Sequence, residues 1–177
     1  MPGMSMSKHL FLTGEKKVGK SSAIKKFLSI AQPDFSGYQT QPVIINERIR
    51  GYALHSFEAL DEEENDVIIS VRAGVRRNIC VEGIFDTIGV KIIQAAVAAD
   101  AELVIIDELG KLEDNAPDFQ AAIKQLLDSN HRVLGVLQKK ESKMSALLNE
   151  RDDCEIIEIS EADRDMAVDK ISQWYRG

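Results

Sequence analysis

The sequence predicts an α/β fold in which a mostly parallel sheet carries helices on both faces and has an antiparallel hairpin as an insertion or at one edge. Strand-like and helix-like segments alternate along most of the chain, which requires parallel strands joined by crossover helices. The unbroken apolar run at residues 103–106 is typical of a central strand that helices cover on both faces. Short alternation of apolar and polar residues at 38–57, broken by Asn46 and Gly51, indicates antiparallel strands instead.

The other elements are predicted from short apolar runs and from helical spacing. Further strands are expected at residues 8–13, 67–71, 79–81, 133–137 and 155–159. Helices are expected at residues 19–31, 84–99, from 117 onward, at 144–148 and near the C-terminus. Pro33 ends the first helix, Pro117 opens the third because proline is favoured at the first helical position, and Ser160 with Asp163 makes a capping box for the last.

Composition and charge limit the class of protein. The 177 residues are 44% hydrophobic and 29% charged, so we predict a single domain over residues 1–177 with a flexible leader at residues 1–7. The net charge of −7 argues against a nucleic-acid binder, which needs a basic face. No stretch approaches the roughly 20 apolar residues of a membrane span, and Cys80 and Cys154 are too few for a disulfide framework. We therefore expect a cytoplasmic protein without membrane contact.

A phosphate-binding pattern follows the first predicted strand. Gly14, Gly19, Lys20 and Ser21 occupy the fixed positions of the motif G-x-x-x-x-G-K-[ST]. In this motif backbone N–H groups surround phosphate oxygens at the start of a helix, the lysine contacts the β- and γ-phosphates, and the hydroxyl contacts Mg²⁺. We also assign Lys20 a catalytic role. The residues expected to bind the nucleotide are Gly14, Glu15, Lys16, Lys17, Val18, Gly19, Lys20, Ser21 and Ser22.

Two carboxylates end the central strand. Asp107 and Glu108 follow residues 103–106, and the carboxyl end of this strand should lie at the same edge of the sheet as Gly14. Asp107 is the candidate to hold Mg²⁺ through a water molecule, together with Ser21. Glu108 is the candidate general base, which would orient and deprotonate an attacking water. The two segments together favour hydrolysis of a nucleoside triphosphate, such as ATP or GTP, to the diphosphate and phosphate.

The chain resembles the cancer-related nucleoside-triphosphatase family of small P-loop proteins over nearly its whole length. The resemblance is carried by residues 9–14, 18–21, 37–40 (GYQT) and, above all, 104–113 (VIIDELGKLE). It implies a RecA-like P-loop domain that hydrolyses nucleoside triphosphates with Mg²⁺ and loose base preference, and it places Lys111 and Glu113 near the site. Residues 15–17 (EKK) stand where the family has Pro-Pro-Gly or similar.

Two alternative functions are left open by the sequence. A small-molecule or nucleoside kinase would use the same phosphate loop, and residues 81–86 could supply an acid on the acceptor side. A nucleotide-binding switch with little turnover is suggested by residues 86–89, which spell D-x-x-G, although the chain lacks the Asn/Thr-Lys-x-Asp motif that reads guanine. An arginine that stabilises transition-state charge could be any of Arg72, Arg76, Arg77, Arg132, Arg151 and Arg164.

Overall fold

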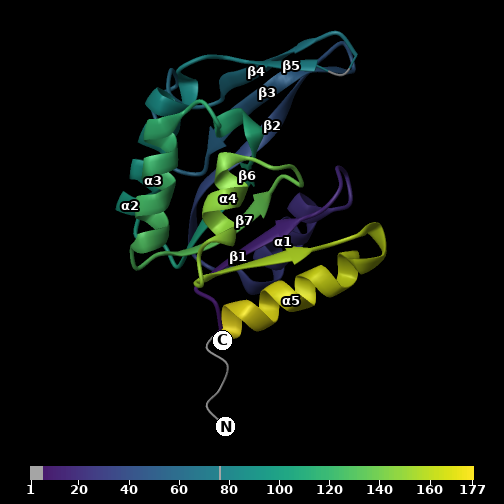
Figure 1. Cartoon of the computed structure of the whole chain (residues 1–177), viewed down its shortest axis with the longest axis vertical. Coiled ribbons are helices and arrows are strands. Elements are labelled where there is room, and N and C mark those ends of the chain that lie inside the picture. The colour runs from purple at the N-terminus through teal and green to yellow at the C-terminus, as the bar shows by residue number, and fades with distance from the viewer. Residues whose placement is uncertain (1–5, 76) are drawn as a thin grey trace.

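The computed structural model describes residues 6–75 and 77–177. An eight-stranded sheet runs through it in the order β5-β4-β3-β2-β6-β7-β1-β8 (Figure 1). The strands are β1 (His9–Thr13), β2 (Phe35–Ile45), β3 (Arg48–Ser56), β4 (Val67–Ala73), β5 (Arg77–Cys80), β6 (Leu103–Leu109), β7 (Arg132–Leu137) and β8 (Cys154–Glu158). The helices are α1 (Lys20–Ala31), α2 (Val90–Ala98), α3 (Pro117–Asp128), α4 (Lys143–Asn149) and α5 (Arg164–Arg176), with a π-helical turn η1 (Phe85–Gly89) and 3-10 turns η2 (Lys111–Glu113) and η3 (Glu161–Asp163).

The sheet has a parallel half and an antiparallel half. β2, β6, β7, β1 and β8 are parallel neighbours, whereas β2, β3, β4 and β5 form an antiparallel meander at one edge. β2 belongs to both halves, because residues 35–39 pair with β6 and the rest of the strand pairs only with β3, up to Ile45 opposite Arg48. The predicted α/β fold with an antiparallel edge is therefore confirmed, and the antiparallel part is larger than one hairpin.

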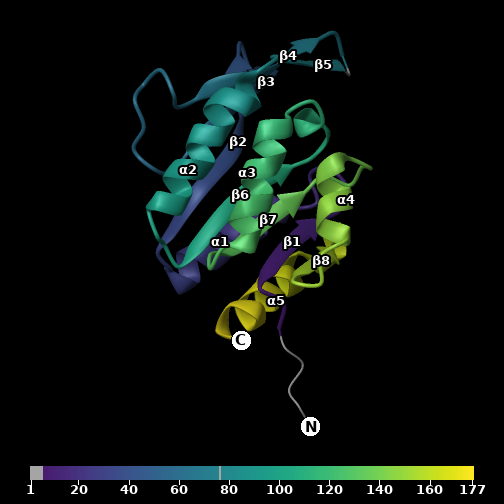
Figure 2. The same cartoon turned by 60° about the vertical axis from the view of Figure 1, so that its left-hand side comes forward.

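Helices cover both faces of the sheet (Figures 1 and 2). Side chains alternate between the two faces along each strand, so Leu10 and Leu12 pack with α1 and α5 whereas Phe11 packs with α2 and α3. Residues 103–106 of β6 alternate in the same way, which explains why the run is apolar without interruption. Trp174 belongs to α5, is 2% exposed and packs in the core on the α1 and α5 face of the sheet.

Some boundaries differ from the sequence prediction: β4 extends to Ala73 and β6 to Leu109, and β5 covers Arg77–Cys80 rather than residues 79–81. β2 begins at Phe35 rather than at residue 38, because Phe35 already pairs with Leu103 of β6. The helix expected at residues 84–99 is divided into the π-helical turn η1 and α2. Apolar spacing does not distinguish a π-helical turn from the α-helix that it joins.

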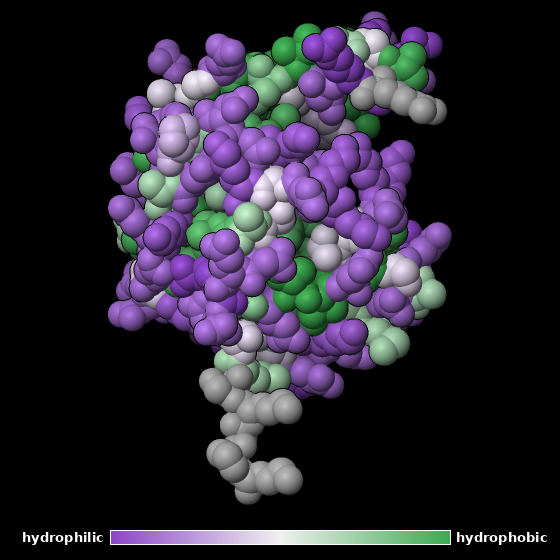
Figure 3. Space-filling view, in the orientation of Figure 1, coloured by the Kyte–Doolittle hydropathy of each residue, from purple (hydrophilic) through white to green (hydrophobic). Residues whose placement is uncertain are grey.

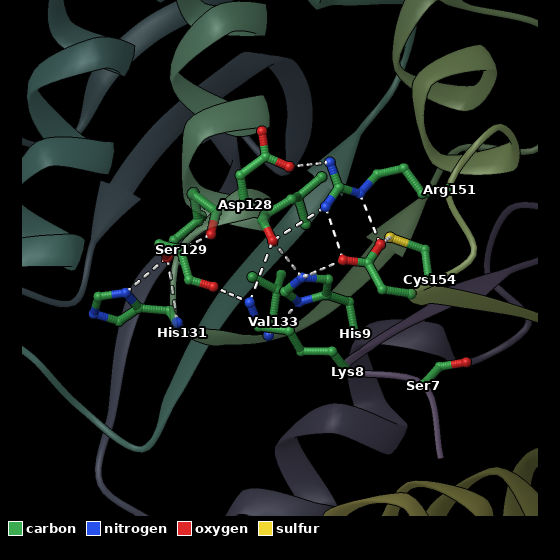
Figure 4. Close-up of polar contacts among 12 residues, drawn as sticks. Ser7, Lys8, His9, Asp128, Ser129, His131, Val133, Arg151 and Cys154 are labelled. Carbon is green, nitrogen blue, oxygen red and sulfur yellow. Dashed lines mark hydrogen bonds and ion pairs between the residues drawn. The ribbon is translucent and has the colours of Figure 1, made fainter. Parts of the chain in front are cut away.

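A polar network closes the amino edge of the parallel strands (Figure 4). His9 is fully buried, its Nδ1 accepts a hydrogen bond from the N–H of Val133 at 3.1 Å, and its Nε2 lies 2.9 Å from the carbonyl oxygen of Leu127. Arg151 donates to the same carbonyl and to the carboxylate of Asp153. Burial lowers the pKa of His9 to about 4, so the neutral ring ties β1 and β7 to the end of α3.

The chain ends, the cysteines and the surface add further observations. The predicted leader lies outside the described residues over positions 1–5, and the Ser7 carbonyl accepts a hydrogen bond from Trp174 Nε1 at 2.8 Å. Cys80 and Cys154 are unpaired and only partly buried. Hydrophilic residues predominate on the face shown in Figure 3, and apolar side chains reach it in smaller patches. In the part of the chain that the structure describes, every helix is too short or too polar to cross a membrane.

Candidate functional site

The loop between β1 and α1 carries the phosphate-binding pattern. Gly14 and Gly19 have φ angles of 148° and 104°, and Lys17 has a φ angle of 62°. Such backbone can turn successive N–H groups into one concavity that binds anions. A side chain at Gly14 would lie 2.3 Å from the carbonyl oxygen of Ile159, so glycine is required where the loop passes the end of β8. The loop residues that face solvent are Glu15, Lys16, Lys17 and Ser22, and those that are half-buried are Val18, Gly19, Lys20 and Ser21.

The Lys20 side chain folds back across this loop. Its Nζ donates hydrogen bonds to the carbonyl oxygens of Gly14 at 2.6 Å and Glu15 at 3.0 Å. Burial lowers the pKa of Lys20, and the negative charges of Glu108 and Asp107 oppose this shift. The fold thus brings the lysine of the phosphate loop within electrostatic reach of both carboxylates at the end of β6.

Asp107 and Ser21 lie together between β6 and the first turn of α1. Burial raises the pKa of Asp107, whereas a hydrogen bond with the Ser21 side chain and the charges of Lys25 and Lys20 lower it. A hydroxyl beside a carboxylate provides hard oxygen donors. Mg²⁺ is usually held by one or two carboxylates and completes its coordination with water and substrate phosphates, so these two residues fit the ion.

Glu108 has surroundings suited to a general base. Burial raises its pKa, Asp107 raises it further, and the charges of Lys20 and Lys16 oppose the shift. A carboxylate takes a proton from water more readily when its pKa moves toward neutrality. The pKa shift therefore agrees with the role expected for Glu108, which stays a prediction.

Two buried residues of the family resemblance, Tyr38 from residues 37–40 and Glu113 from residues 104–113, support the segment around Glu108. Tyr38 is fully buried, and its hydroxyl donates to the carbonyl oxygen of Glu108 at 3.3 Å. Glu113 is 3% exposed, and its Oε2 accepts a hydrogen bond from the N–H of Gly110 at 2.8 Å. Burial raises the pKa of Glu113 to about 8. Lys111, in contrast, is exposed.

Two residues after β7 reach the site although the sequence analysis assigned them no role. The Oε1 atom of Gln138 accepts a hydrogen bond from the N–H of Lys111 at 3.1 Å. The Nζ atom of Lys139 lies 3.2 Å from a carboxylate oxygen of Glu15 in the phosphate loop. The signal that could have found these two residues is their position directly after a strand. β7 lies between β6 and β1, so the residues after β7 lie at the same edge of the sheet as the phosphate loop and Asp107.

Among the candidate arginines that the structure describes, Arg164 contacts the phosphate loop. Arg164 begins α5, its Nε donates to the carbonyl oxygen of Val18 at 2.8 Å, and its Nη2 donates to that of Lys17 at 3.2 Å. Nothing in the local sequence distinguishes it from the others, because the contact depends on where α5 packs. The other candidates are Arg132 over the Trp174 ring, Arg151 at Asp128 and Asp153, Arg72 at the Val75 carbonyl, Arg77 exposed on β5, and Arg76, which lies outside the described residues.

The residues that suggested a kinase or a switch have structural contacts. The Oδ1 atom of Asp86 accepts a hydrogen bond from the N–H of Phe119 at 3.0 Å, near the start of α3. A side chain at Gly89 would lie 2.8 Å from the Phe119 ring. The D-x-x-G sequence therefore fits the packing of η1 against α3.

Comparison with protein families gives a match over most of the chain. A family model described as NTPase matches residues 9–172. The nucleoside-triphosphatase THEP1 of Natranaerobius thermophilus is 23% identical over 168 residues, which cover 93% of this chain and 94% of the relative. The nucleoside-triphosphatase THEP1 of Thermococcus kodakarensis is 29% identical over 144 residues, which cover 76% of this chain and 78% of the relative.

Two solved structures share the fold. The crystal structure of THEP1 from the hyperthermophile Aquifex aeolicus has a TM-score of 0.71 and 22% identity, with 92% of this chain and 96% of that chain covered. The solution structure of a human cancer-related nucleoside triphosphatase has a TM-score of 0.70 and 20% identity, with 93% and 95% covered. Because the family model spans nearly the whole chain, the protein belongs to this NTPase family.

Proposed function

We propose that the protein is a Mg²⁺-dependent phosphohydrolase that converts nucleoside triphosphates to diphosphates and phosphate with broad base preference, and that residues 1–177 act as one P-loop domain. The observation that carries the proposal is that β1 and β6 are parallel strands on either side of β7, so the phosphate loop with Lys20 and the carboxylates Asp107 and Glu108 lie at the same edge of the sheet. Membership of the NTPase family and the relatives named nucleoside-triphosphatases support the same reaction.

The phosphate loop would bind the triphosphate chain. Its backbone N–H groups, from Lys16 to Ser22, would surround the β-phosphate at the start of α1. The Nζ of Lys20 would exchange its carbonyl partners Gly14 and Glu15 for phosphate oxygens, which accept stronger, charge-assisted hydrogen bonds. Mg²⁺ held by Ser21 and Asp107 would neutralise phosphate charge and align the β- and γ-phosphates.

Glu108 would act on the water that attacks the γ-phosphorus. Its carboxylate accepts a proton from the water while the new oxygen–phosphorus bond forms, and the bond from the γ-phosphorus to the bridging oxygen breaks. The diphosphate leaves with the electron pair of that bond, and Glu108 returns its proton to solvent. Lys20 stabilises the negative charge on the phosphate oxygens during this transfer.

The broad base preference and the cellular compartment are each supported by a separate observation. The absence of a guanine-reading motif from the sequence supports a broad base preference. The unpaired cysteines, Cys80 and Cys154, support a reducing compartment, and we propose the cytoplasm.

Phosphate release and nucleotide binding, measured for ATP, GTP, CTP and UTP with and without Mg²⁺, test the proposed function. Lys20→Ala should lose binding. Glu108→Gln should bind nucleotide but hardly release phosphate, because the amide cannot take the proton. The matched control is Glu150→Gln, an exposed carboxylate at the end of α4, which should change neither quantity.

Three outcomes would redirect the proposal. Unaltered turnover in Glu108→Gln would remove the base assignment and leave the binding site standing. Phosphoryl transfer that requires a hydroxyl-bearing metabolite would identify a kinase. Tight binding of GTP alone, without turnover, would identify a switch.

A further inference from the structure

Lys139 is held at the site by two carboxylates. Its Nζ lies 3.2 Å from the Oε1 of Glu15, in the phosphate loop, and 2.6 Å from the Oε1 of Glu158, at the end of β8. The lysine follows β7 by two residues, and β7 lies between β6 and β1 in the sheet. Lys139 therefore leaves the carboxyl edge between the strand that ends near Glu108 and the strand that leads into the phosphate loop.

This position is close to the other charges of the site. The positive charge of Lys139 lowers the pKa of Lys20, and the charge of Glu15 raises it. Lys20 also donates to the backbone carbonyl of Glu15 at 3.0 Å. The two lysines thus share Glu15 as a neighbour, one through its carbonyl and the other through its carboxylate.

The pair between Lys139 and Glu15 is weak enough to be exchanged. The Lys139 side chain is 45% exposed and that of Glu15 is 77% exposed. Ion pairs between exposed side chains are weak, because water screens the charges and long side chains lose freedom. A triphosphate brings about four negative charges to the same loop, and its terminal oxygens make stronger partners for an ammonium group. The Glu15 carboxylate, in contrast, repels the triphosphate.

We propose that Glu15 holds Lys139 in the nucleotide-free protein, and that the γ-phosphate replaces Glu15 so that Lys139 becomes a second phosphate-binding cation beside Lys20. This inference rests on the proposed function, which supplies the substrate. Lys139 then distinguishes a triphosphate from a diphosphate, and it stabilises the charge that spreads over the γ-phosphate during hydrolysis.

Binding of a non-hydrolysable triphosphate analogue and of the diphosphate, measured by calorimetry, tests the inference. Lys139→Met should weaken triphosphate binding about ten- to a hundredfold, as expected when one charge-assisted contact is lost, and should change diphosphate binding less than about twofold. Lys139→Arg should restore most of the difference. The neighbouring exposed Lys140 gives the matched control, because Lys140→Met removes the same charge from the loop after β7.

Glu15→Gln is the second arm of the experiment. If Glu15 competes with the γ-phosphate for Lys139, the amide variant should bind the triphosphate about threefold to tenfold more tightly. In the Lys139→Met background the same change should have a smaller effect, because it removes only the repulsion between Glu15 and the triphosphate and no lysine is released. Glu158→Gln controls for the other partner of Lys139, which lies outside the phosphate loop.

The results separate this inference from the proposed function. Equal losses of triphosphate and diphosphate binding in Lys139→Met, or no loss of either, would overturn the role of Lys139 even if phosphate release is normal. Selective loss of the triphosphate in a protein that releases no phosphate would support Lys139 and overturn hydrolysis. If the unaltered protein binds neither nucleotide, both proposals fall. Circular dichroism and thermal unfolding confirm that each variant is folded.

Discussion

The carboxyl group of Glu113 accepts a hydrogen bond from the backbone N–H of Gly110, at 2.8 Å, inside the turn that follows Asp107 and Glu108. Burial raises the pKa of Glu113 to about 8, the two backbone hydrogen bonds of its carboxyl oppose this, and the charge of Glu108 adds to the rise. Glu113 is therefore mostly uncharged at neutral pH. An uncharged group in this place holds the turn without adding a third negative charge beside the pair that faces the phosphate loop.

Glu113→Gln should make the protein less sensitive to alkaline pH. The folded pKa of about 8 lies above the ordinary value of 4.5, so the stabilisation linked to Glu113 is complete below pH 4.5 and is lost as the pH rises through 8. Glutamine keeps an oxygen acceptor for Gly110 and does not titrate. Between pH 5 and pH 9 the free energy of unfolding should fall by about 2 to 4 kcal/mol less in the variant than in the unaltered protein. Urea unfolding at the two pH values measures this difference. Equal losses in both proteins would contradict the assignment.

His9 predicts a loss of stability on the acid side. Its Nδ1 accepts from the Val133 N–H and the ring is fully buried, so the folded protein disfavours the protonated form. The folded pKa of about 4 lies below the ordinary 6.5, so the unfolded chain takes up a proton first as the pH falls. The free energy of unfolding should fall by about 2 to 3 kcal/mol as the pH falls from 6.5 to 4. His9→Asn keeps an acceptor near Val133 and should flatten this part of the unfolding profile, and an unchanged slope would rule His9 out as its cause.

The sequence was sufficient to predict the elements that local pattern determines. The apolar runs of β1 and β6 serve two cores at once and therefore have no polar interruption. The phosphate loop has a fixed pattern because its backbone must turn tightly at Gly14 and Gly19. The parallel order then requires Gly14 and Asp107 to lie at one edge, and this conclusion needs no contact between distant side chains.

The contacts that hold the site residues in place could not be predicted from the sequence, because they join segments that are far apart in the chain. Arg164 meets Val18 across 146 positions, and Tyr38 meets Glu108 across 70. Such contacts depend on how α5 and β2 pack against the sheet. The meander was underestimated for a related reason: the pairing of β4 with β3 and of β5 with β4 also depends on contacts between separate segments.

Gly37→Ala should destabilise the protein strongly. Gly37 has a φ angle of 109°, and a side chain there would lie 2.0 Å from the carbonyl oxygen of Ile105 in the paired strand β6. Backbone cannot move aside as a flexible side chain can, so we expect a loss of about 3 kcal/mol or more in the free energy of unfolding. Gly74→Ala is the control, because Gly74 also has a positive φ but no atom of the residues that the structure describes lies within 4 Å of a side chain there. It should lose about 1 to 2 kcal/mol, and similar losses in both variants would remove the steric argument.

Arg164→Ala should weaken the binding of triphosphate and diphosphate equally. The Arg164 side chain holds the carbonyl oxygens of Val18 and Lys17, so its loss frees the phosphate loop to sample conformations that do not bind. We expect the dissociation constant to rise about threefold to tenfold for both nucleotides.

The same variant should unfold almost normally. A positive charge in the first turn of a helix is unfavourable for the helix dipole, so removing Arg164 from the start of α5 offsets part of the lost hydrogen bonding. Arg176→Ala, at the last turn of α5, removes an equal charge far from the loop and should leave binding unchanged. Calorimetry with ATP analogue and ADP separates this effect from that of Lys139, because a loosened loop weakens both nucleotides whereas a lost γ-phosphate contact weakens only one. Selective loss of triphosphate binding in Arg164→Ala would instead mean that the guanidinium contacts the γ-phosphate itself.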